Sequence, residues 1–327
     1  AGWGNMPTLL SYLTMGRLEI FTQLQIDMGF DMDFRLSGGL TGMHTEAHFE
    51  YFEARTHSLR AAGYDGELLT PREARAIEPG ASQEMLGYLH LPGRGQADPV
   101  KSTQAFAEAA RRAGASIDTG QNVTAISIEG NGGYSVRTDT AEYRCQTLVL
   151  AAGSWCGPVG RMLGLNIPIK PIRGQMWATE KLPPRVFHLI SSAESSYAWS
   201  IDNGADESTP PNLTHKGDRR MTRHLYGRQR KNGEIIFGGD RQDVGYNSTP
   251  DPDGIDVNRG QAAEVVPVVA NLPIARTWGG LMPFSIDGAP IIGRIPMRDN
   301  LFIVSGLASS GFGRGPMAGK LAADFIH

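Results

Sequence analysis

The sequence predicts a mixed α/β protein, and two stretches of it lead to that fold class. Asp98 and Pro99 form a good cap and first turn for a helix that runs to residue 113, ends at Gly114 and is followed by an antiparallel meander. At the end of the chain, an apolar strand at residues 301–304 passes through a glycine-rich turn into a closing helix. Strands and helices in this order are typical of sheets covered by helices.

The other elements follow from local patterns along the chain. Residues 7–29 carry apolar side chains at nearly helical spacing and predict one long helix, and residues 45–62 predict a second helix that stops at Gly63. Asn131, Gly132 and Gly133 predict a hairpin turn within the meander. Its strands are expected at residues 115–118, 123–128, 134–137 and 143–150.

The composition fits a protein with a large core. The chain has 327 residues, 40% of them apolar, which suffices for one large or two ordinary domains. A net charge of −3 gives no reason to expect a nucleic-acid partner. No apolar run approaches the roughly 20 residues of a membrane span. With no visible signal peptide either, we expect a soluble cytoplasmic protein.

Cysteines and histidines give no sign of a metal site. Two cysteines, Cys145 and Cys156, are too few for a disulfide framework or a four-ligand metal centre. His44 and His48 lie at helical spacing, but Glu46 stands one place away from its position in the H-E-x-x-H zinc pattern. We therefore interpret both histidines as surface residues of a helix and expect no bound metal.

The closing strand, turn and helix suit a flat ligand with negative charge. Gly306, Gly311, Gly313 and Gly315 let the backbone pass close to such a ligand, and Pro316 is suited to the first turn of the helix. A helix start presents free amide groups and a partial positive charge, which would favour a reduced flavin along its N1 and C2 carbonyl edge. A turn that serves only packing explains the same glycines, so both interpretations stay open.

A second candidate segment lies at the end of the meander. A buried apolar strand at residues 147–150 runs directly into two alanines and a glycine, Ala151, Ala152 and Gly153, followed by Ser154 and Trp155. Small residues at a strand end allow a ligand to approach closely. Tight packing under a crossover helix is the alternative.

Together these segments resemble the FAD-dependent amine and amino-acid oxidoreductases of the D-amino acid oxidase family, which includes glycine oxidase and sarcosine oxidase. The likeness runs in order over nearly the whole chain, from the helix after Asp98 through Val123 and residues 151–155 to residues 171–175 and the closing strand, turn and helix. The resemblance implies bound FAD and two interleaved domains. An FAD-binding, Rossmann-like domain of the hydroxybenzoate-hydroxylase type is expected at residues 1–34, 95–170 and 288–327, and a substrate domain on a mixed or antiparallel sheet at residues 35–94 and 171–287.

The resemblance also implies which residues meet FAD. The backbone of Val123 is expected at the adenine end, and residues 151–155 along the pyrophosphate and ribitol. Residues 306–313 are expected at the flavin edge, and residues 1–5 in a loop near the flavin ring. The expected cofactor-binding residues are Gly2, Trp3, Gly4, Asn5, Val123, Ala151, Ala152, Gly153, Trp155, Gly306, Ser309, Gly311, Phe312 and Gly313.

One part of the family pattern is missing from this sequence. Members begin with a strand, a G-x-G-x-x-G turn and a helix, followed by a strand whose acidic residue binds the adenosine ribose. The sequence starts at Ala1 without this unit. It therefore predicts an N-terminally truncated fragment, without the turn that should bind the pyrophosphate.

The family's reaction implies a small amine or amino-acid substrate: a D-amino acid, glycine or an N-methyl amino acid. Hydride passes from the carbon that bears the amine to flavin N5, and the imine then hydrolyses. An arginine usually holds the substrate carboxylate through a bidentate bond. Many relatives have Gly-Leu-Arg-Pro where this chain has Met282 in place of the arginine. Met282 cannot bind a carboxylate, so either another cation takes over or the substrate presents a different group.

Other side chains are therefore candidates for orienting the substrate. Arg228 and Tyr226 come first, because alternation along a strand expected at residues 224–229 puts both on one face. Arg314 in the closing turn, Arg173 and Tyr246 are further candidates, and Met282 at the usual arginine position is also a candidate for contact with the substrate. A surface ion pair is the alternative for each arginine.

Two other functions remain open at this point. A flavin dehydrogenase of the glycerol-3-phosphate type would need several cations around a phosphate. A non-catalytic binding or regulatory module would share the fold without the chemistry. The electron acceptor is open between oxygen, a quinone and another protein.

Overall fold

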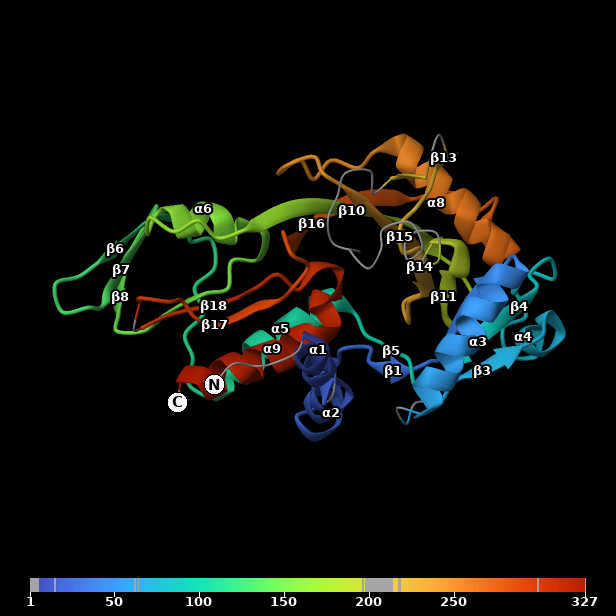
Figure 1. Ribbon diagram of the computed structural model, residues 1–327, viewed down its shortest axis with the longest axis horizontal. Helices are drawn as coiled ribbons and strands as arrows, with labels where there is room; N and C mark the ends of the chain where they lie inside the picture. The colour runs from blue at the N-terminus through green and yellow to red at the C-terminus, as the bar shows by residue number, and fades with distance from the viewer. Residues whose placement is uncertain are drawn as a thin grey trace. The chain divides into compact units, whose positions relative to one another are not determined.

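The computed structural model describes residues 6–14, 16–61, 63, 65–195, 197, 214–216, 219–298 and 300–326 (Figure 1). The chain forms two compact units, each built from separate stretches of sequence. The first consists of Ala1–Met32, Pro99–Ile172 and Met282–His327, and the second of Asp33–Asp98 and Arg173–Leu281. Helices and mixed parallel and antiparallel sheets confirm the predicted α/β class.

A parallel pair of strands, β9 and β18, forms the centre of the first unit. Leu148 pairs with Leu301 and Leu150 with Ile303, and β17 adds an antiparallel strand on the other side of β18. Helix α9 packs against β17 and β18, and α1 packs against α9. The elements are α1 (Met6–Thr14), α2 (Arg17–Thr22), a π-helix (Gln23–Asp27), α5 (Pro99–Arg112), β9 (Leu148–Leu150), α6 (Cys156–Arg161), β17 (Ile291–Arg294), β18 (Leu301–Ser305) and α9 (Gly311–Ile326).

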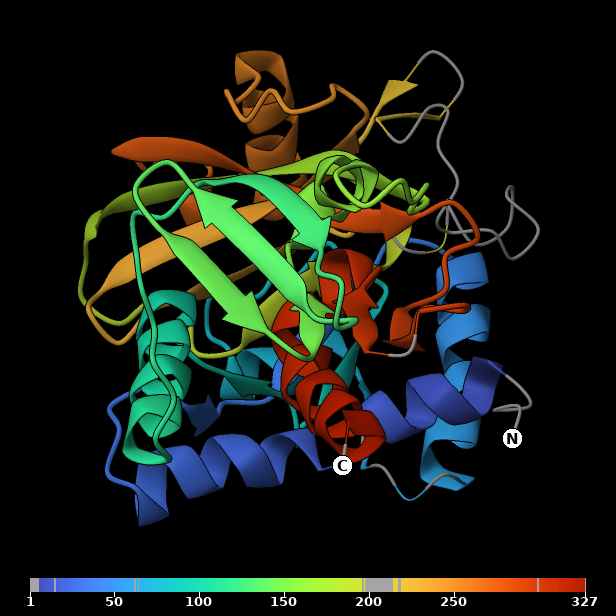
Figure 2. The same cartoon turned by 90° about the vertical axis from the view of Figure 1, so that its left-hand side faces the viewer.

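The predicted meander is a separate antiparallel sheet of the same unit, drawn in green at the front of Figure 2. The turn at Gly132 is confirmed, with a φ of 82° at that residue and a hydrogen bond from the Glu129 amide to the Gly133 carbonyl. The side chains of Ile126 and Tyr134 pack with Leu150, so the meander and the parallel pair share one core. Its strands are β6 (Val123–Ile128), β7 (Tyr134–Thr138) and β8 (Glu142–Cys145).

The second unit is built on an eight-stranded sheet with the order β16-β10-β15-β14-β11-β2-β4-β3. Strands β2 and β11 run parallel, and the neighbours from β10 through β15 and β14 to β11 run antiparallel. The elements are β1 (Arg35–Leu36), β2 (Gly39–Met43), α3 (Glu46–Ala61), β3 (Glu67–Leu69), α4 (Pro71–Ile77), β4 (Gly87–Leu91), β5 (Gly95–Gln96), β10 (Ile169–Lys181), β11 (Leu189–Ser192), β12 (His215–Lys216), β13 (Arg219–Arg220), β14 (Tyr226–Gln229), β15 (Glu234–Gln242), α8 (Pro252–Val265) and β16 (Arg276–Ser285).

Helix α8 covers one face of this sheet. Its apolar residues join a core in which Trp177 stacks on Phe237 with ring centroids 5.5 Å apart. The Trp177 indole donates to Asn258 of α8 at 2.7 Å, so the buried ring nitrogen is satisfied. The core residues of this cluster are Leu40, Ala74, Ala81, Met85, Tyr88, Trp177, Val186, Ile190, Leu225, Ile235, Phe237, Ile255, Ala262, Val265, Val266 and Val269.

A buried polar network anchors the start of α8. Asp251 caps the helix by accepting from the Asp253 amide, and it also accepts from Gln242 at 2.8 Å and from Arg220. Asp240, 3% exposed, accepts from Gln175 at 3.0 Å and lies 3.6 Å from Arg220. Burial is the main cause that raises the pKa of Asp240 to about 6.

Several predicted elements need correction. The long helix expected at residues 7–29 is two helices and a π-helix, because Gly16 takes a left-handed φ of 69°. The strand expected at residues 143–150 is two strands of different sheets, β8 and β9. Residues 115–118 form no strand. The closing helix begins at Gly311, so Pro316 lies inside it rather than in its first turn.

No helix in the described part of the chain is both long enough and apolar enough to cross a membrane.

Candidate functional site

Two turns of the first unit lie side by side at one edge of its parallel sheet. Strand β9 leads into Ala151, and β18 leads into Gly306. The Ser305 hydroxyl donates to the Gly153 carbonyl at 3.2 Å and joins the two turns directly. Because the carboxyl ends of parallel strands meet at the same edge, a ligand in this position would meet both turns.

Two glycines of these turns, Gly306 and Gly153, differ in what surrounds them. Gly306 has a φ of 74°, and a Cβ there would lie 2.9 Å from the Ala289 carbonyl oxygen, so packing against the segment before β17 requires it. Gly153 has a φ of 54°, but a Cβ there would meet no atom within 4 Å. Open space beside a left-handed glycine is what a cofactor that approaches the backbone needs.

The surface beside the two turns suits a flat cofactor. Ala151 and Ser309 are exposed, and the aromatic side chains of Trp155 and Phe312 are 52% and 47% exposed. The centroid of the Phe312 ring lies 5.4 Å from that of the Phe21 ring, so the two rings pack against each other. The first turn of α9 contains no acidic side chain, so nothing there offsets the positive end of the helix dipole.

Not every expected cofactor residue takes part in this arrangement. Val123 is half-buried at the start of β6. Gly2, Trp3, Gly4 and Asn5 lie outside the described residues. Sequence reasoning missed Ser305, since the last residue of an apolar strand gives no signal of the hydrogen bond that it makes to the other turn.

The substrate-orienting candidates of the second unit come from strand β14. A Cβ at Gly227 would lie 2.1 Å from the Phe237 ring, so Gly227 faces the core under α8. Tyr226 and Arg228 therefore point to the opposite face of the sheet, as the alternation predicts. Ser191 lies beside Tyr226 on that face. The strand begins at Tyr226, two residues later than expected.

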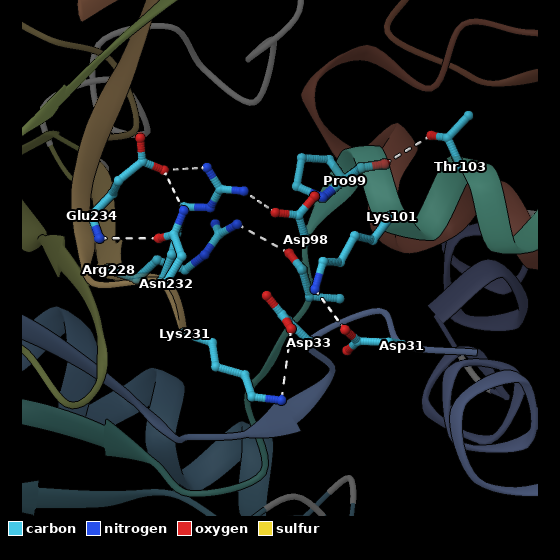
Figure 3. A network of polar contacts seen from close by, with 12 residues as sticks. Asp31, Asp33, Asp98, Pro99, Lys101, Thr103, Arg228, Lys231, Asn232 and Glu234 are labelled. Carbon is cyan, nitrogen blue, oxygen red and sulfur yellow. Dashed lines mark hydrogen bonds and ion pairs between the residues drawn. The ribbon is translucent and has the colours of Figure 1, made fainter. Parts of the chain in front are cut away.

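Arg228 makes a single, neutral contact. One of its Nη atoms donates to the backbone carbonyl of Ala97 at 3.0 Å (Figure 3). Within the described part of the chain this is the only hydrogen bond of its side chain, and no carboxylate lies within ion-pair distance of the guanidinium. Burial lowers the pKa of Arg228, with Arg230 and Arg35 acting in the same direction. The guanidinium stays charged, because arginine is not deprotonated in proteins.

The neighbouring charges are already paired with one another. Arg230 bonds both Asp98 and Glu234, the latter at 2.5 Å (Figure 3). Arg276 also bonds Glu234, at 2.9 Å. Burial acts to raise the pKa of Glu234, but hydrogen bonds from Asn232 and Arg276 lower it, so the carboxylate stays ionised. The network leaves Arg228 with no carboxylate at ion-pair distance among the described residues, although the nearby charge of Asp98 acts to raise its pKa.

The other candidates lie elsewhere. Arg173 is 5% exposed and donates to Gln242 at 2.8 Å and to the Thr249 carbonyl, which makes it a structural residue. Tyr246 lies exposed in the turn after β15. Met282 in β16 and Arg314 in α9 belong to the first unit.

Comparison with known proteins defines the family. Residues 4–325 match the family model described as DAO, FAD dependent oxidoreductase. The chain therefore belongs to this family of FAD-dependent oxidoreductases.

Individual relatives agree with that assignment. A hydrogen cyanide synthase subunit HcnC from Pseudomonas protegens is 33% identical over 67% of this chain and 46% of its own length, so the chain spans about half of that relative. Sarcosine oxidase subunit beta from Rhizobium meliloti is 26% identical over 94% of this chain and 69% of its own. The crystal structure of glycine oxidase from Geobacillus kaustophilus covers 98% of this chain with a TM-score of 0.80 and 21% identity, over 78% of its own length, and shows the same fold.

Proposed function

We propose that this chain takes part in the FAD-dependent oxidation of a small amine or amino acid. Family membership supports FAD as the cofactor. When bound, FAD supplies the acceptor for the hydride that leaves the carbon bearing the amine, and the resulting imine hydrolyses. The residues of the chain then have two tasks, to hold the cofactor and to orient the substrate.

The first unit is the proposed FAD-binding part. Its two joined turns offer open space at Gly153, exposed aromatic rings at Trp155 and Phe312, and the start of α9. Backbone amides at a helix start favour an anionic group. This proposal assigns residues 1–34, 95–170 and 288–327 to the cofactor and residues 35–94 and 171–287 to the substrate.

The single observation behind the substrate class is the neutral partner of Arg228. A charged guanidinium that bonds only a backbone carbonyl retains donors for a carboxylate, and Tyr226 on the same face adds a hydroxyl. An amino acid, glycine or an N-methyl amino acid supplies such a carboxylate. Met282 stands where many relatives have an arginine, so Arg228 and Tyr226 are the residues that we propose for binding the carboxylate.

A glycerol-3-phosphate substrate fits this environment less well. A phosphate would need several cations, and Arg230 is already neutralised by Asp98 and Glu234. Arg35, like Arg228, donates to a backbone carbonyl, that of Gln229 at 2.7 Å, so these two arginines remain for an anion. Two arginines fall short of the cluster of cations that we expect around a phosphate.

Spectroscopy of the protein expressed from its own gene tests this proposal. The purified protein should show the visible absorption bands of flavin. Under anaerobic conditions, glycine, sarcosine or a D-amino acid should bleach them. If only glycerol 3-phosphate bleaches the flavin bands, the substrate is a phosphate ester and not an amine or amino acid. Absence of flavin after reconstitution with FAD would contradict the cofactor assignment.

A further inference from the structure

A cluster of side chains on the second unit lies apart from Tyr226, Arg228 and their network. His44, Glu194 and Glu264 each bring one potential ligand atom into a group in which all atoms lie within 4.8 Å of one another. In the described part of the chain this is the only such group of three or more. The expectation that His44 and His48 are both ordinary surface residues is wrong, because His48 is 5% exposed and the His44 ring nitrogens are buried.

The topology of the sheet brings two of these residues together. Strands β2 and β11 are parallel neighbours, with Ser192 paired to Gly42. His44 follows the end of β2 and Glu194 follows the end of β11, so both leave the sheet at the same edge. The carboxyl ends of parallel strands are a common place for ligand sites.

The last turn of α8 supplies the third residue. A Cβ at Gly42 would lie 2.9 Å from Cγ1 of Val265, so glycine at this position lets the end of α8 approach β2 closely. Glu264 precedes Val265 and reaches His44, with 3.3 Å between Oε2 and Nε2. Three separate elements thus converge on one point.

The geometry at His44 differs from that of an ordinary hydrogen bond. Both ring nitrogens are shielded from solvent, and neither makes a hydrogen bond in the described structure, although Oε2 of Glu264 is close. Two ligands bound to one ion at about 2.0–2.1 Å with tetrahedral angles stand roughly 3.3 Å apart. The 3.3 Å between Nε2 of His44 and Oε2 of Glu264 therefore fits two ligands of one metal ion better than a hydrogen bond between the two side chains.

We propose that His44, Glu194 and Glu264 bind one divalent transition-metal ion of the zinc class. One imidazole and two carboxylates suit Zn²⁺ and its neighbours, and a tetrahedral ion with three protein ligands keeps its fourth position for water. Glu264, with 40% of its side chain exposed, leaves access for that water. The ion would tie together the ends of β2, β11 and α8.

The contacts already made by these residues do not prevent binding. Glu194 forms an ion pair with Arg219 at 2.7 Å, and the Arg219 side chain is 57% exposed. Exposed pairs of this kind are weak, so an ion can compete with Arg219 for the carboxylate. His48 lies beside the group and accepts from the His44 amide through Nδ1 at 3.4 Å, which helps to orient the segment.

The test is Zn²⁺ titration of the whole protein, produced without a metal-binding tag and stripped with EDTA. We expect one Zn²⁺ per chain by isothermal titration calorimetry, with a higher melting temperature and no competition from excess Mg²⁺. Glu264→Gln and Glu194→Gln should each weaken Zn²⁺ binding at least about tenfold. Mutation of a residue that only hydrogen-bonds a metal ligand already lowers metal affinity by that factor.

A second histidine–glutamate pair in the same unit provides the control. His90 Nδ1 lies 2.8 Å from Oε1 of Glu67, and this pair belongs to no group of three ligands among the described residues. Glu67→Gln should leave Zn²⁺ affinity unchanged. Equal affinity in wild type and Glu264→Gln would overturn the site, as would no measurable binding to wild type or an equal loss in Glu67→Gln.

Discussion

An Nη atom of Arg228 donates to the backbone carbonyl of Ala97 at 3.0 Å. The bond fixes one side of the guanidinium without neutralising it, and the rigid β14 strand holds the other end of the side chain. An arginine prepared in this way loses little entropy when it binds a carboxylate, so its remaining donors can contribute fully.

Replacing Arg228 should therefore weaken the binding of a carboxylate substrate. With glycine as the substrate, Arg228→Ala should raise KM by about 100-fold, the equivalent of about 3 kcal/mol for a charge-assisted bidentate bond. Glycinamide, which lacks the carboxylate, should show little change. Steady-state kinetics measure both effects.

Arg259→Ala is the matched control. Arg259 lies on α8, which covers the face of the sheet opposite to Arg228, and it pairs with Asp256 at 3.5 Å. Its loss removes the same charge from the other face of the sheet. It should leave KM for glycine unchanged. If Arg228→Ala leaves the preference for glycine over glycinamide intact, Arg228 does not bind the carboxylate.

Gly227 should not tolerate any side chain. A Cβ there would lie 2.1 Å from the Phe237 ring, which also stacks on Trp177. Gly227→Ala should lower the free energy of unfolding by about 1–3 kcal/mol through overpacking. Urea denaturation measures this change, and a loss below about 0.5 kcal/mol would mean that the core relaxes freely.

Gly260 offers the opposite case in α8. A Cβ there would meet nothing within 4 Å, and the residue lies inside the helix. Gly260→Ala should raise the free energy of unfolding by about 1 kcal/mol, the difference in helix propensity. A destabilising effect would show that the α8 surface is covered at this position.

Asp240 should make stability depend on pH between about 4 and 6. Its pKa is raised to about 6, mainly by burial, from the ordinary value of 3.8. The folded state binds more protons than the unfolded state in this window, so the contribution of Asp240 to the free energy of unfolding falls as pH rises. At about 1.4 kcal/mol per pKa unit, this contribution falls by about 3 kcal/mol over the whole window.

Urea denaturation at several pH values separates this contribution from that of other groups. Wild type should lose stability relative to Asp240→Asn from pH 4 to pH 6 and show no further relative loss above that. Asparagine tolerates the left-handed φ of 69° found at this position, so the backbone is retained. A difference that does not vary with pH would indicate an ordinary pKa.

Ser305→Ala should affect the cofactor more than the fold. The substitution removes the hydrogen bond to the Gly153 carbonyl, at a cost of about 1 kcal/mol in stability. Loss of this link frees the two turns from each other, so FAD affinity, measured by flavin fluorescence, should fall. Ser58→Ala removes a comparable bond on the exposed face of α3 and should leave FAD affinity unchanged.

The sequence predicted those elements whose signals are local. The Asp98-Pro99 start of α5, the turn at Gly132 and the alternation of Tyr226 and Arg228 each depend on a few neighbouring residues, and each is confirmed. The break at Gly16 was missed, because apolar spacing continued across it and one glycine is a weak signal against a helix.

The arrangement of distant residues could not be predicted in this way. Tyr143 and Leu150 belong to one expected strand, yet β9 pairs with β18 from the end of the chain, which places it in another sheet. The single neutral contact of Arg228 depends on Ala97, more than a hundred residues earlier. The convergence of His44 and Glu264 likewise requires the packing of α8, which periodicity does not specify.

Hydrogen–deuterium exchange with and without FAD tests most directly whether the two joined turns of the first unit hold the cofactor. We expect slower amide exchange on FAD binding in residues 151–155 and 306–313, with little change in the β6–β8 meander beyond its first residue, Val123. Unchanged exchange in both turns while FAD is bound would contradict this expectation.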